Sequence, residues 1–376
     1  MAHGSGPVPL DDYPVHQVAL SMRHMATSDR NAYDRYYFNA HDRTGQLFMV
    51  SGLGVYPNLG VIDAFATVTT GRRQHTVRFS DALGDDRMSA RVGAYRVEVV
   101  EPLQTVRLVC EAEEHGMAFD LTFDASFAAV EEPPHVMRQN GRIILDAQRF
   151  AQVGTWSGRL AVAGRQLVVS DDRWVGTRDR SWGIRPVGEA EPPGRSAAEP
   201  DPAFGFWWTY VPLRFDDFAL VVIAQEDGGG NRVLSEAVRV WPAGSSTRTE
   251  QLGWPEIAVR YRSGTRLPEG ASLQLGRRRQ AVTVDLDTLG YVALNCGPGY
   301  GGDPDWGHGQ WRGRGWTESV VVDLDDPAVA GRSAFGVVDH VARARCDGTE
   351  GWGMFEHATF GRHAPSGFAD WGSVAP

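Results

Sequence analysis

One twelve-residue segment, Trp174–Arg185, carries the densest set of chemically capable side chains in the sequence. It holds two tryptophans, three arginines and a single carboxylate, Asp179. A carboxylate among arginines is normally stabilised as the anion, so one interpretation is an ion pair that braces a domain junction. The other places Asp179 at the mouth of an apolar cavity, where loss of hydration raises its pKa enough for proton donation. Asp179 is therefore the first candidate acid.

A second carboxylate, Asp63, stands inside an apolar, strand-like run, Val61–Val68. A carboxylate buried in such a strand must be paired, hydrogen-bonded or neutral. Asp63 is the second candidate acid, and the alternative is that it accepts hydrogen bonds at a bulge.

An aromatic run at Phe206–Tyr210 could line a binding site. In a strand, Phe206, Trp208 and Tyr210 share one face and Trp207 points the other way. Aromatic faces stabilise a carbocation by roughly 0.5–2 kcal/mol each, which suits protonation of an alkene in a dry site. The same rings could instead fill a barrel interior. The candidate substrate-binding residues here and in the first half of the chain are Trp207, Trp208, Tyr210, Tyr37 and Trp182.

The segment Gly297–Trp316 is too long and too rich in glycine for a plain hairpin turn. Long loops in compact domains often bind ligands. His308 lies between tryptophans in this loop and is a candidate base or hydrogen-bond donor, with a solvated loop histidine as the alternative. Trp306 and Trp311 of the same loop are further candidate substrate-binding residues.

Two acidic–histidine pairs, Asp339-His340 and Glu356-His357, invite a metal site. Neighbouring residues on a strand point to opposite faces, however, and the sequence has no HExxH motif and no cysteine pair, so we predict no metal ligands. It also has no Walker A loop, no GxGxxG motif between strand and helix and no GxSxG motif. We therefore predict no cofactor, and nucleotide-dependent and serine-hydrolase chemistry are disfavoured.

The elements that must position these residues are predicted to be strands. Apolar and polar residues alternate with a period of two along much of the chain, as in Met117–Phe123, and turn signals such as Gly84-Asp85-Asp86 separate the runs. Helical patterns are confined to two short stretches, near Val15–Met25 and Asp325–Ala330. Many short strands without βαβ alternation predict an all-β chain, built as a sandwich or as barrels.

The chain has 376 residues, of which 42% are hydrophobic, and this is too long for one ordinary core. Residues 186–203 are rich in proline, glutamate and alanine and nearly lack large apolar side chains, which is typical of a linker or surface loop. We predict an N-terminal extension at 1–28, a first barrel at 29–185, the linker at 186–203 and a second barrel at 204–376.

Charge and composition narrow the partners and the compartment. With 37 Lys plus Arg against 47 Asp plus Glu, the net charge is −10, which disfavours nucleic acid and anionic membranes. No stretch approaches the ~18 apolar residues of a membrane span, and the first residues lack the features of a secretory signal. Three scattered cysteines suit a reducing compartment. We expect a cytoplasmic protein whose partner is a hydrophobic small molecule, and a homodimer is left open.

Several motifs resemble one known family. The pattern Gly176-x-x-Asp179-x-x-Trp182-Gly183 resembles the D-x-x-W/F-G signature of the AttH-like and carotenoid 1,2-hydratase (hydroxyneurosporene synthase) lipocalin-like superfamily. Asp34–Asn39 and Gly52–Asp63 are similar to its aromatic first strand and its glycine-rich run. Gly351–His357 is similar to the terminal strand of uncharacterised actinobacterial relatives.

This resemblance implies two consecutive lipocalin-like (calycin) antiparallel barrels with few short helices and a ligand site in or between them. It also implies that Asp179 matches the acid with which the hydratases add water to an isoprenoid double bond. Thr177 departs from the hydratase pattern, which has an aromatic residue at that position.

Three classes of function are compatible with these features. A cofactor-free enzyme, a lyase (hydratase) or an isomerase or cyclase acting on a terpenoid, steroid, polyketide or lipid, predicts Asp179 or Asp63 facing a closed apolar cavity beside another polar group. A non-catalytic lipid or isoprenoid carrier or sensor predicts a wholly apolar cavity, with both aspartates ion-paired outside it. A carbohydrate-binding protein predicts tryptophans on an open platform. The enzyme is our leading hypothesis.

Overall fold

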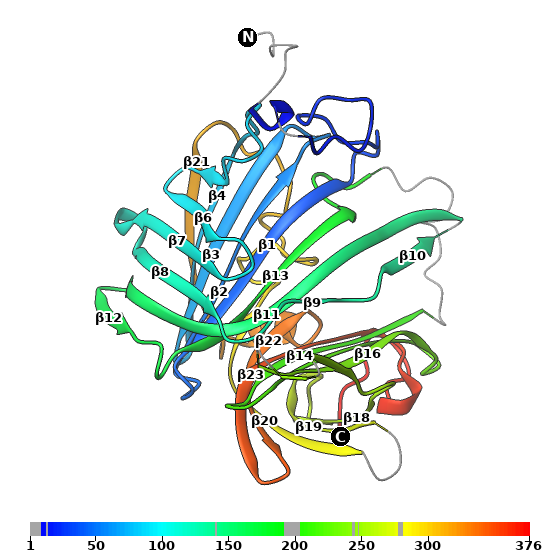
Figure 1. The fold of residues 1–376 in the computed structure, drawn as a ribbon. Coiled ribbons are helices and arrows are strands. Elements are labelled where there is room, and N and C mark those ends of the chain that lie inside the picture. The colour runs from blue at the N-terminus through cyan, green and yellow to red at the C-terminus, as the bar shows by residue number, and fades with distance from the viewer. Residues whose placement is uncertain are drawn as a thin grey trace.

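The structure, a computed structural model, describes residues 9–12, 14–139, 141–191, 204–242, 245–246, 248–276 and 281–376. Nearly all regular structure in these residues is antiparallel β, arranged as two sheets that each curl into a half-barrel (Figure 1). This confirms the predicted all-β class with few short helices.

The first sheet has fourteen strands, in the order β21-β4-β3-β2-β1-β13-β11-β8-β7-β6-β5, with β9, β10 and β12 paired to β11. Its strands are β1 (Ala32–His41), β2 (Leu47–Tyr56), β3 (Val61–Thr70), β4 (Arg73–Ala82), β5 (Arg91–Val92), β6 (Tyr95–Glu101), β7 (Thr105–Ala112), β8 (Met117–Ala125), β9 (Val130–Glu131), β10 (His135–Gln139), β11 (Arg142–Val162), β12 (Arg165–Val169), β13 (Val175–Ile184) and β21 (Trp316–Asp323).

The second sheet has nine strands, in the order β17-β16-β15-β14-β23-β22-β20-β19-β18. These strands are β14 (Gly205–Arg214), β15 (Ala219–Asp227), β16 (Arg232–Val240), β17 (Thr249–Gln251), β18 (Glu256–Tyr261), β19 (Pro268–Leu275), β20 (Val282–Ala293), β22 (Val338–Cys346) and β23 (Thr349–Gly361). The described helices are short: η1 (Pro9–Asp12), η2 (Glu113–His115), α1 (Pro327–Ser333) and η5 (Ala364–Ser366).

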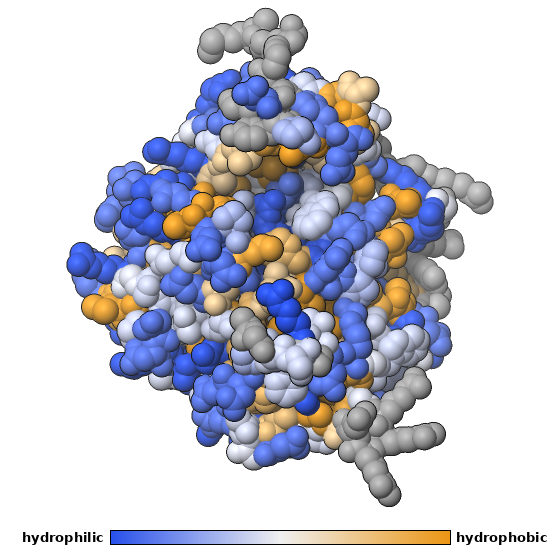
Figure 2. Space-filling view, in the orientation of Figure 1, coloured by the Kyte–Doolittle hydropathy of each residue, from blue (hydrophilic) through white to orange (hydrophobic). Residues whose placement is uncertain are grey.

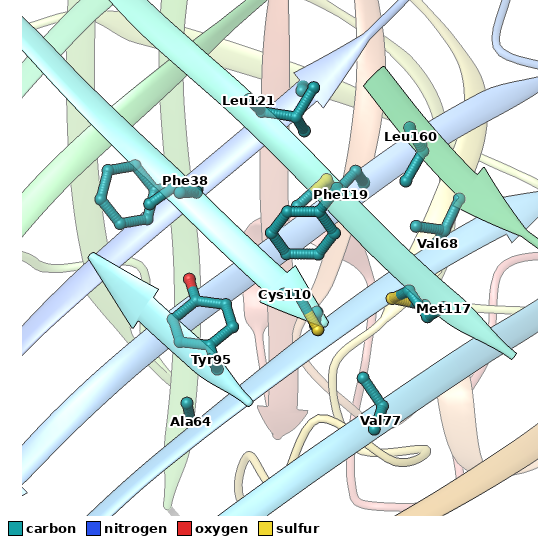
Figure 3. Packing of buried hydrophobic residues seen from close by; sticks show 14 of the residues in the cluster. Phe38, Ala64, Val68, Val77, Tyr95, Cys110, Met117, Phe119, Leu121 and Leu160 are labelled. Atoms are coloured by element: carbon teal, nitrogen blue, oxygen red, sulfur yellow. The ribbon is translucent and has the colours of Figure 1, made fainter. Parts of the chain in front are cut away.

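Alternation of apolar residues gives the strands of the first sheet one apolar face, and the sheet buries this face by curling around it. In β8 every second residue from Met117 to Phe123 is buried, as the sequence predicts. These side chains meet Cys110 of β7 and Val77 of β4 in one apolar cluster (Figure 3). Phe79 of β4 packs on Tyr95 of β6, with ring centres 6.3 Å apart. Because β4 and β6 lie near opposite ends of the strand order, this contact closes the sheet around its own core.

A second apolar cluster lies between the two sheets. It joins Tyr37 of β1 and Val50 of β2 to Trp208 and Tyr210 of β14 and Met354 of β23. The intervening residues of the same strands face the interior of their own half-barrel. Strands buried on both faces therefore present one set of side chains to a dry core and a second set to the interface.

The strands before residue 186 belong to the first sheet and those after residue 203 to the second, with one exception. β21 belongs to the second half of the chain but pairs with β4 at the edge of the first sheet, where its orange ribbon lies beside blue strands (Figure 1). Of the predicted linker, residues 192–203 lie outside the described residues. The division into four segments stays a prediction.

One of the two predicted helices forms. Pro327–Ser333 is helical, capped by Asp326, whose side chain accepts a hydrogen bond from the Ala328 amide. The expected helix near Val15–Met25 is wrong: this segment has turns and bends, and Val15 and Leu20 are 44% and 48% exposed. A helix this short needs an apolar face to bury, and these side chains pack on no core.

The outer surface is mixed in polarity. The face in Figure 2 is mostly polar or intermediate, with apolar residues in small separate groups. Within the described ranges, no helix is long and apolar enough to cross a bilayer.

Candidate active site between the two sheets

A cavity of about 240 Å³, the central cavity, lies between the two sheets. Strands β1, β10, β11 and β13 of the first sheet and β14 and β23 of the second contribute to its wall, with Tyr300 from the loop after β20. In the registers of β13 with its two neighbours, Asp179 stands opposite Tyr37 on one side and Ala151 on the other. Directly paired residues point to the same face, and here that face meets the second sheet.

Asp179 faces the central cavity from the middle of β13. Its carboxyl group has no hydrogen bond or ion pair with any residue in the described part of the chain. Burial raises the pKa of Asp179 to about 7. Arg149 opposes this rise, whereas the charges of Glu132 and Glu356 add to it. A carboxyl group with a pKa raised into this range exists in both protonation states near neutral pH, which suits a group that donates a proton.

Two arginines of the Trp174–Arg185 segment, Arg178 and Arg180, have partners other than Asp179. Arg178 Nε donates to Gln152 at 2.9 Å, and Arg180 Nη2 pairs with Asp34 at 2.6 Å. Both arginines lie at even positions of β13, on the face opposite Asp179.

Arg149 of β11 brings a positive charge into the cavity wall. Its Nε donates to Glu132 at 2.6 Å, and the Glu132 side chain is only 1% exposed. The guanidinium lies over the rings of Trp208 and Tyr210, at 5.5 and 5.3 Å from their centres. Because Arg149 is hydrogen-bonded to Glu132, it is not bound to Asp179. Its positive charge still lowers the pKa of Asp179 and so opposes the effect of burial.

A pair of carboxyl groups lies beside Asp179. Asp339 of β22 stands opposite Glu356 of β23. Tyr37 donates its hydroxyl to Asp339 Oδ2 at 2.5 Å, and Trp208 Nε1 donates to Glu356 Oε1 at 2.5 Å. Burial and the charge of Glu356 hold the pKa of Asp339 well above its usual value. Burial beside a second carboxyl group therefore favours the protonated form of Asp339.

A stacked histidine completes this wall. His135 of β10 lies parallel to Trp208, with ring centres 5.5 Å apart, and its Nε2 is 2.5 Å from Gln225 Oε1. Burial and Arg149 lower the pKa of His135 to about 4. The ring is therefore neutral at pH 7 and donates to the Gln225 oxygen.

The structure brings three of the sequence-predicted aromatic residues to this interface. Tyr37 and Trp208 line the central cavity, and Tyr210 packs beside them, its buried hydroxyl without a hydrogen bond to any described residue. Trp207 points into the second half-barrel, as strand alternation predicts, and donates to Tyr261 at 3.2 Å. Trp182 lies on the other face of β13, 39% exposed, with its edge against Phe150.

Asp63 and His308 lie together next to the central cavity but do not line it. Asp63 Oδ1 accepts a hydrogen bond from Tyr56 at 3.0 Å, and Oδ2 accepts one from the Gly309 amide at 2.6 Å. Asp63 therefore anchors to β3 the segment Gly297–Trp316, called the glycine-rich loop from here on. Burial raises the pKa of Asp63 to about 7. His308 is stacked on Phe65 and is buried, which excludes the solvated-histidine alternative.

The two loop tryptophans have different environments. Trp306 is 1% exposed and packs edge-to-face on His308 at 5.3 Å. Trp311 is 49% exposed and does not line the central cavity.

Sequence reasoning missed Glu132, Arg149 and Tyr300 and gave no acidic role to Asp339 or Glu356. The usable signal was strand parity: Asp339 and Glu356 each precede a histidine on a strand, so both acids face one side and both histidines the other. His340 and His357 do face the second half-barrel. Among the described residues, no three His, Cys, Asp or Glu side chains are placed to hold one metal ion.

The fold is the lipocalin-type β fold that the sequence resemblance implies, and an AttH-like protein of known structure shares it. A putative AttH from Nitrosomonas europaea has a similar structure, with a TM-score of 0.53 and 16% identity, over 94% of this chain and 98% of that chain. The chain belongs to a family of unknown function (DUF8625), whose model matches residues 8–369. Its placement in an actinobacterial branch stays a prediction.

Two further solved structures have a more distant likeness. Kievitone hydratase from Nectria haematococca has a TM-score of 0.47 and 14% identity, over 86% of this chain and 88% of that chain. CghA has a TM-score of 0.47 and 12% identity, over 88% of each chain. No curated protein matches the sequence.

Proposed function

We propose that this protein is a cofactor-free enzyme that performs acid–base chemistry on a hydrophobic small molecule in the central cavity. The reaction classes that fit are hydration or dehydration, isomerisation and cyclisation. The observation that carries the proposal is Asp179, a cavity-facing carboxyl group that no described residue pairs with, whose pKa is raised to about 7. Such a group exists in both protonation states near neutral pH and can both give and take a proton.

The surroundings of Asp179 favour a developing positive charge on the ligand. The rings of Tyr37, Phe206 and Trp208 line the same cavity, and aromatic faces attract cations. In a hydration, the Asp179 O–H bond breaks as a C–H bond forms on the alkene. The oxygen of a water molecule then bonds to the cationic carbon, and the proton that this water releases returns to the Asp179 carboxylate. In an isomerisation, the returning proton leaves a neighbouring carbon instead.

A non-catalytic carrier is the alternative function. A carrier gains nothing from carboxyl groups held in a low-polarity wall, because each raised carboxyl pKa costs folding stability above the usual pKa. Asp179 and the Asp339–Glu356 pair both face or border the ligand space. This placement favours the enzyme.

The test begins with ligand discovery. Native mass spectrometry of the purified protein, with extraction of bound lipid and a thermal-shift panel of terpenoids, steroids and fatty acids, identifies a ligand. Turnover is then compared for the wild type, Asp179→Asn and the control Asp124→Asn, which alters an exposed carboxyl on β8.

We expect Asp179→Asn to bind the ligand and to lose at least a hundredfold in kcat, since general acid catalysis contributes roughly 10²–10⁴-fold. Asp124→Asn should match the wild type. Ligand bound without turnover would support the carrier, and unchanged turnover in Asp179→Asn would remove Asp179 as the acid. Absence of any bound species or thermal shift would reject both functions.

A further inference from the structure

Arg35 is a buried cation in the wall of the central cavity. It projects from β1, is 4% exposed and has no carboxylate of the described residues within ion-pair distance. Its Nε has no hydrogen-bond partner. The guanidinium lies 5.3 Å from the ring centre of Tyr300, which also lines the cavity. Buried charges are ordinarily paired, so this arrangement leaves the donors of Arg35 available to a ligand.

The polar groups next to Arg35 do not satisfy it. Arg35 Nη2 lies 3.3 Å from His308 Nε2, but that nitrogen is also 2.8 Å from the carbonyl oxygen of Pro298. Burial and the charge of Arg35 hold the pKa of His308 well below its usual value, so the ring is neutral and its Nε2 donates to Pro298. The negative charge of Asp63 stabilises the positive charge of Arg35. Both carboxyl oxygens of Asp63, however, already accept hydrogen bonds, one from Tyr56 and one from the Gly309 amide.

A second guanidinium, that of Arg185, stands where the central cavity meets an outer cleft of about 540 Å³. This outer cleft is lined by residues 185–191 and by the glycine-rich loop, and it shares Arg185 and Tyr300 with the cavity. The cleft's other arginines, Arg30 and Arg142, pair with Glu191 at 3.6 and 2.5 Å. Arg185 makes no ion pair within the described residues and lies 5.5 Å from the ring centre of Tyr33.

The charged groups are ordered along β1 and β13. Tyr37 is paired with Asp179, and Arg35, two residues earlier on β1, is paired with Ser181. Two residues of a strand span about 7 Å. Arg185 follows the end of β13, further in the same direction. The acid and the two unpaired guanidinium groups therefore occupy successive positions in one passage.

We propose that the ligand carries an anionic oxygen group, a carboxylate or an enolate, that binds to Arg35 and Arg185. Its apolar body then lies against Phe206 and Trp208, with the reacting carbon at Asp179, within about 7 Å of the anionic group. Guanidinium groups bind such oxygens through paired, charge-assisted hydrogen bonds. This inference deepens the proposed function and rests on its ligand site, but it concerns binding and requires no turnover.

The test uses matched acids and alcohols that differ only at the head group: cinnamic acid with cinnamyl alcohol, geranic acid with geraniol, and retinoic acid with retinol. Calorimetric titration at pH 8 gives the Kd of each for the wild type, Arg185→Gln and Arg35→Gln. Arg165→Gln is the control, because it removes one exposed charge from β12 of the same sheet, outside both cavities.

We expect an acid in at least one pair to bind at least tenfold more tightly than its alcohol. Arg185→Gln should reduce this preference to less than threefold with the alcohol Kd unchanged, and Arg165→Gln should retain it. Circular dichroism identifies any variant that does not fold, and Arg185, at the rim, can be replaced without opening the core.

Equal binding of acid and alcohol, no binding by any acid, or a preference that survives both arginine substitutions would overturn the inference. The proposed function fails on a different result, a ligand that binds to the wild type without turnover. The two failures are therefore separable.

Discussion

Replacing Asp179 with asparagine should stabilise the protein, and the gain should grow with pH. Asparagine has nearly the shape of aspartic acid but cannot ionise, so the substitution removes the cost of placing a carboxylate in the cavity wall. The folded pKa of Asp179 is about 7, against an ordinary 3.8. Between these values the folded state holds a proton that the unfolded state has released, so the stability of the wild type falls as pH rises.

The size of the effect follows from the shift. Each pKa unit corresponds to about 1.4 kcal/mol, so the full cost above pH 7 has an upper limit of about 4 kcal/mol. Between pH 5 and pH 8 the stability of Asp179→Asn relative to the wild type should increase by about 3 kcal/mol. Above pH 8 the difference should stay level, because Asp179 is then ionised in both states.

Urea unfolding at pH 5, 6, 7, 8 and 9 measures this difference directly. Asp63 has a similar pKa and contributes its own slope to both proteins, so only the difference between them reports on Asp179. The control Asp124→Asn replaces an exposed carboxyl group and should not reproduce the gain in stability that Asp179→Asn shows at pH 8. A gap that stays constant, or that reverses so that the wild type becomes the more stable protein at pH 8, refutes the reasoning. A constant gap would mean that the charge of Arg149 offsets the effect of burial on the pKa of Asp179, and a reversed gap would mean that it outweighs that effect.

Two further predictions concern the groups around Asp179. Arg149→Met should cost about 3–5 kcal/mol, because it leaves Glu132 buried and unpaired. The double variant Arg149→Met/Glu132→Gln should recover part of this loss. Urea unfolding of the wild type, the two single variants and the double variant measures this, and the prediction is wrong if the losses of stability in the two single variants add up to that of the double variant. Gly176→Ala should destabilise by about 3 kcal/mol or more, because its Cβ would lie 1.9 Å from the Asn39 carbonyl oxygen, which accepts from Trp156. Gly84→Ala, with no neighbour within 4 Å, is the control, and equal thermal midpoints for the two alanine variants would be incompatible with this close contact.

Strand parity made much of the fold predictable. The alternation in Met117–Phe123 gave the buried face of β8, and the order of Phe206, Trp207 and Trp208 gave the correct sides of β14. Parity also placed Asp339 and Glu356 each on the opposite face from its own histidine neighbour, as the structure has them. Each of these statements depends on residues within one strand, and a strand carries that information in its own sequence.

The set of residues that meet at the site could not be predicted from the sequence in the same way. Arg149 and Glu132 meet only because β11 pairs with β9 and runs past β13, and Asp339 reaches Tyr37 across 302 positions of sequence. Parity states which side of a strand a residue faces, but not which strand of the other sheet lies opposite. That pairing is fixed by how two curled sheets pack, a property of the whole chain.

The position of β21 is also fixed by how the two sheets pack, and it affects the geometry of the site. The chain leaves the second sheet after β20, forms the glycine-rich loop and adds β21 to the far edge of the first sheet before it returns as β22. The loop between β20 and β21 is thereby tied at both ends to different sheets. Asp63 holds its middle through the Gly309 amide. Tyr300, which faces Arg35 in the central cavity, is carried on this tethered segment, so the geometry of the cavity depends on both sheets keeping their relative position.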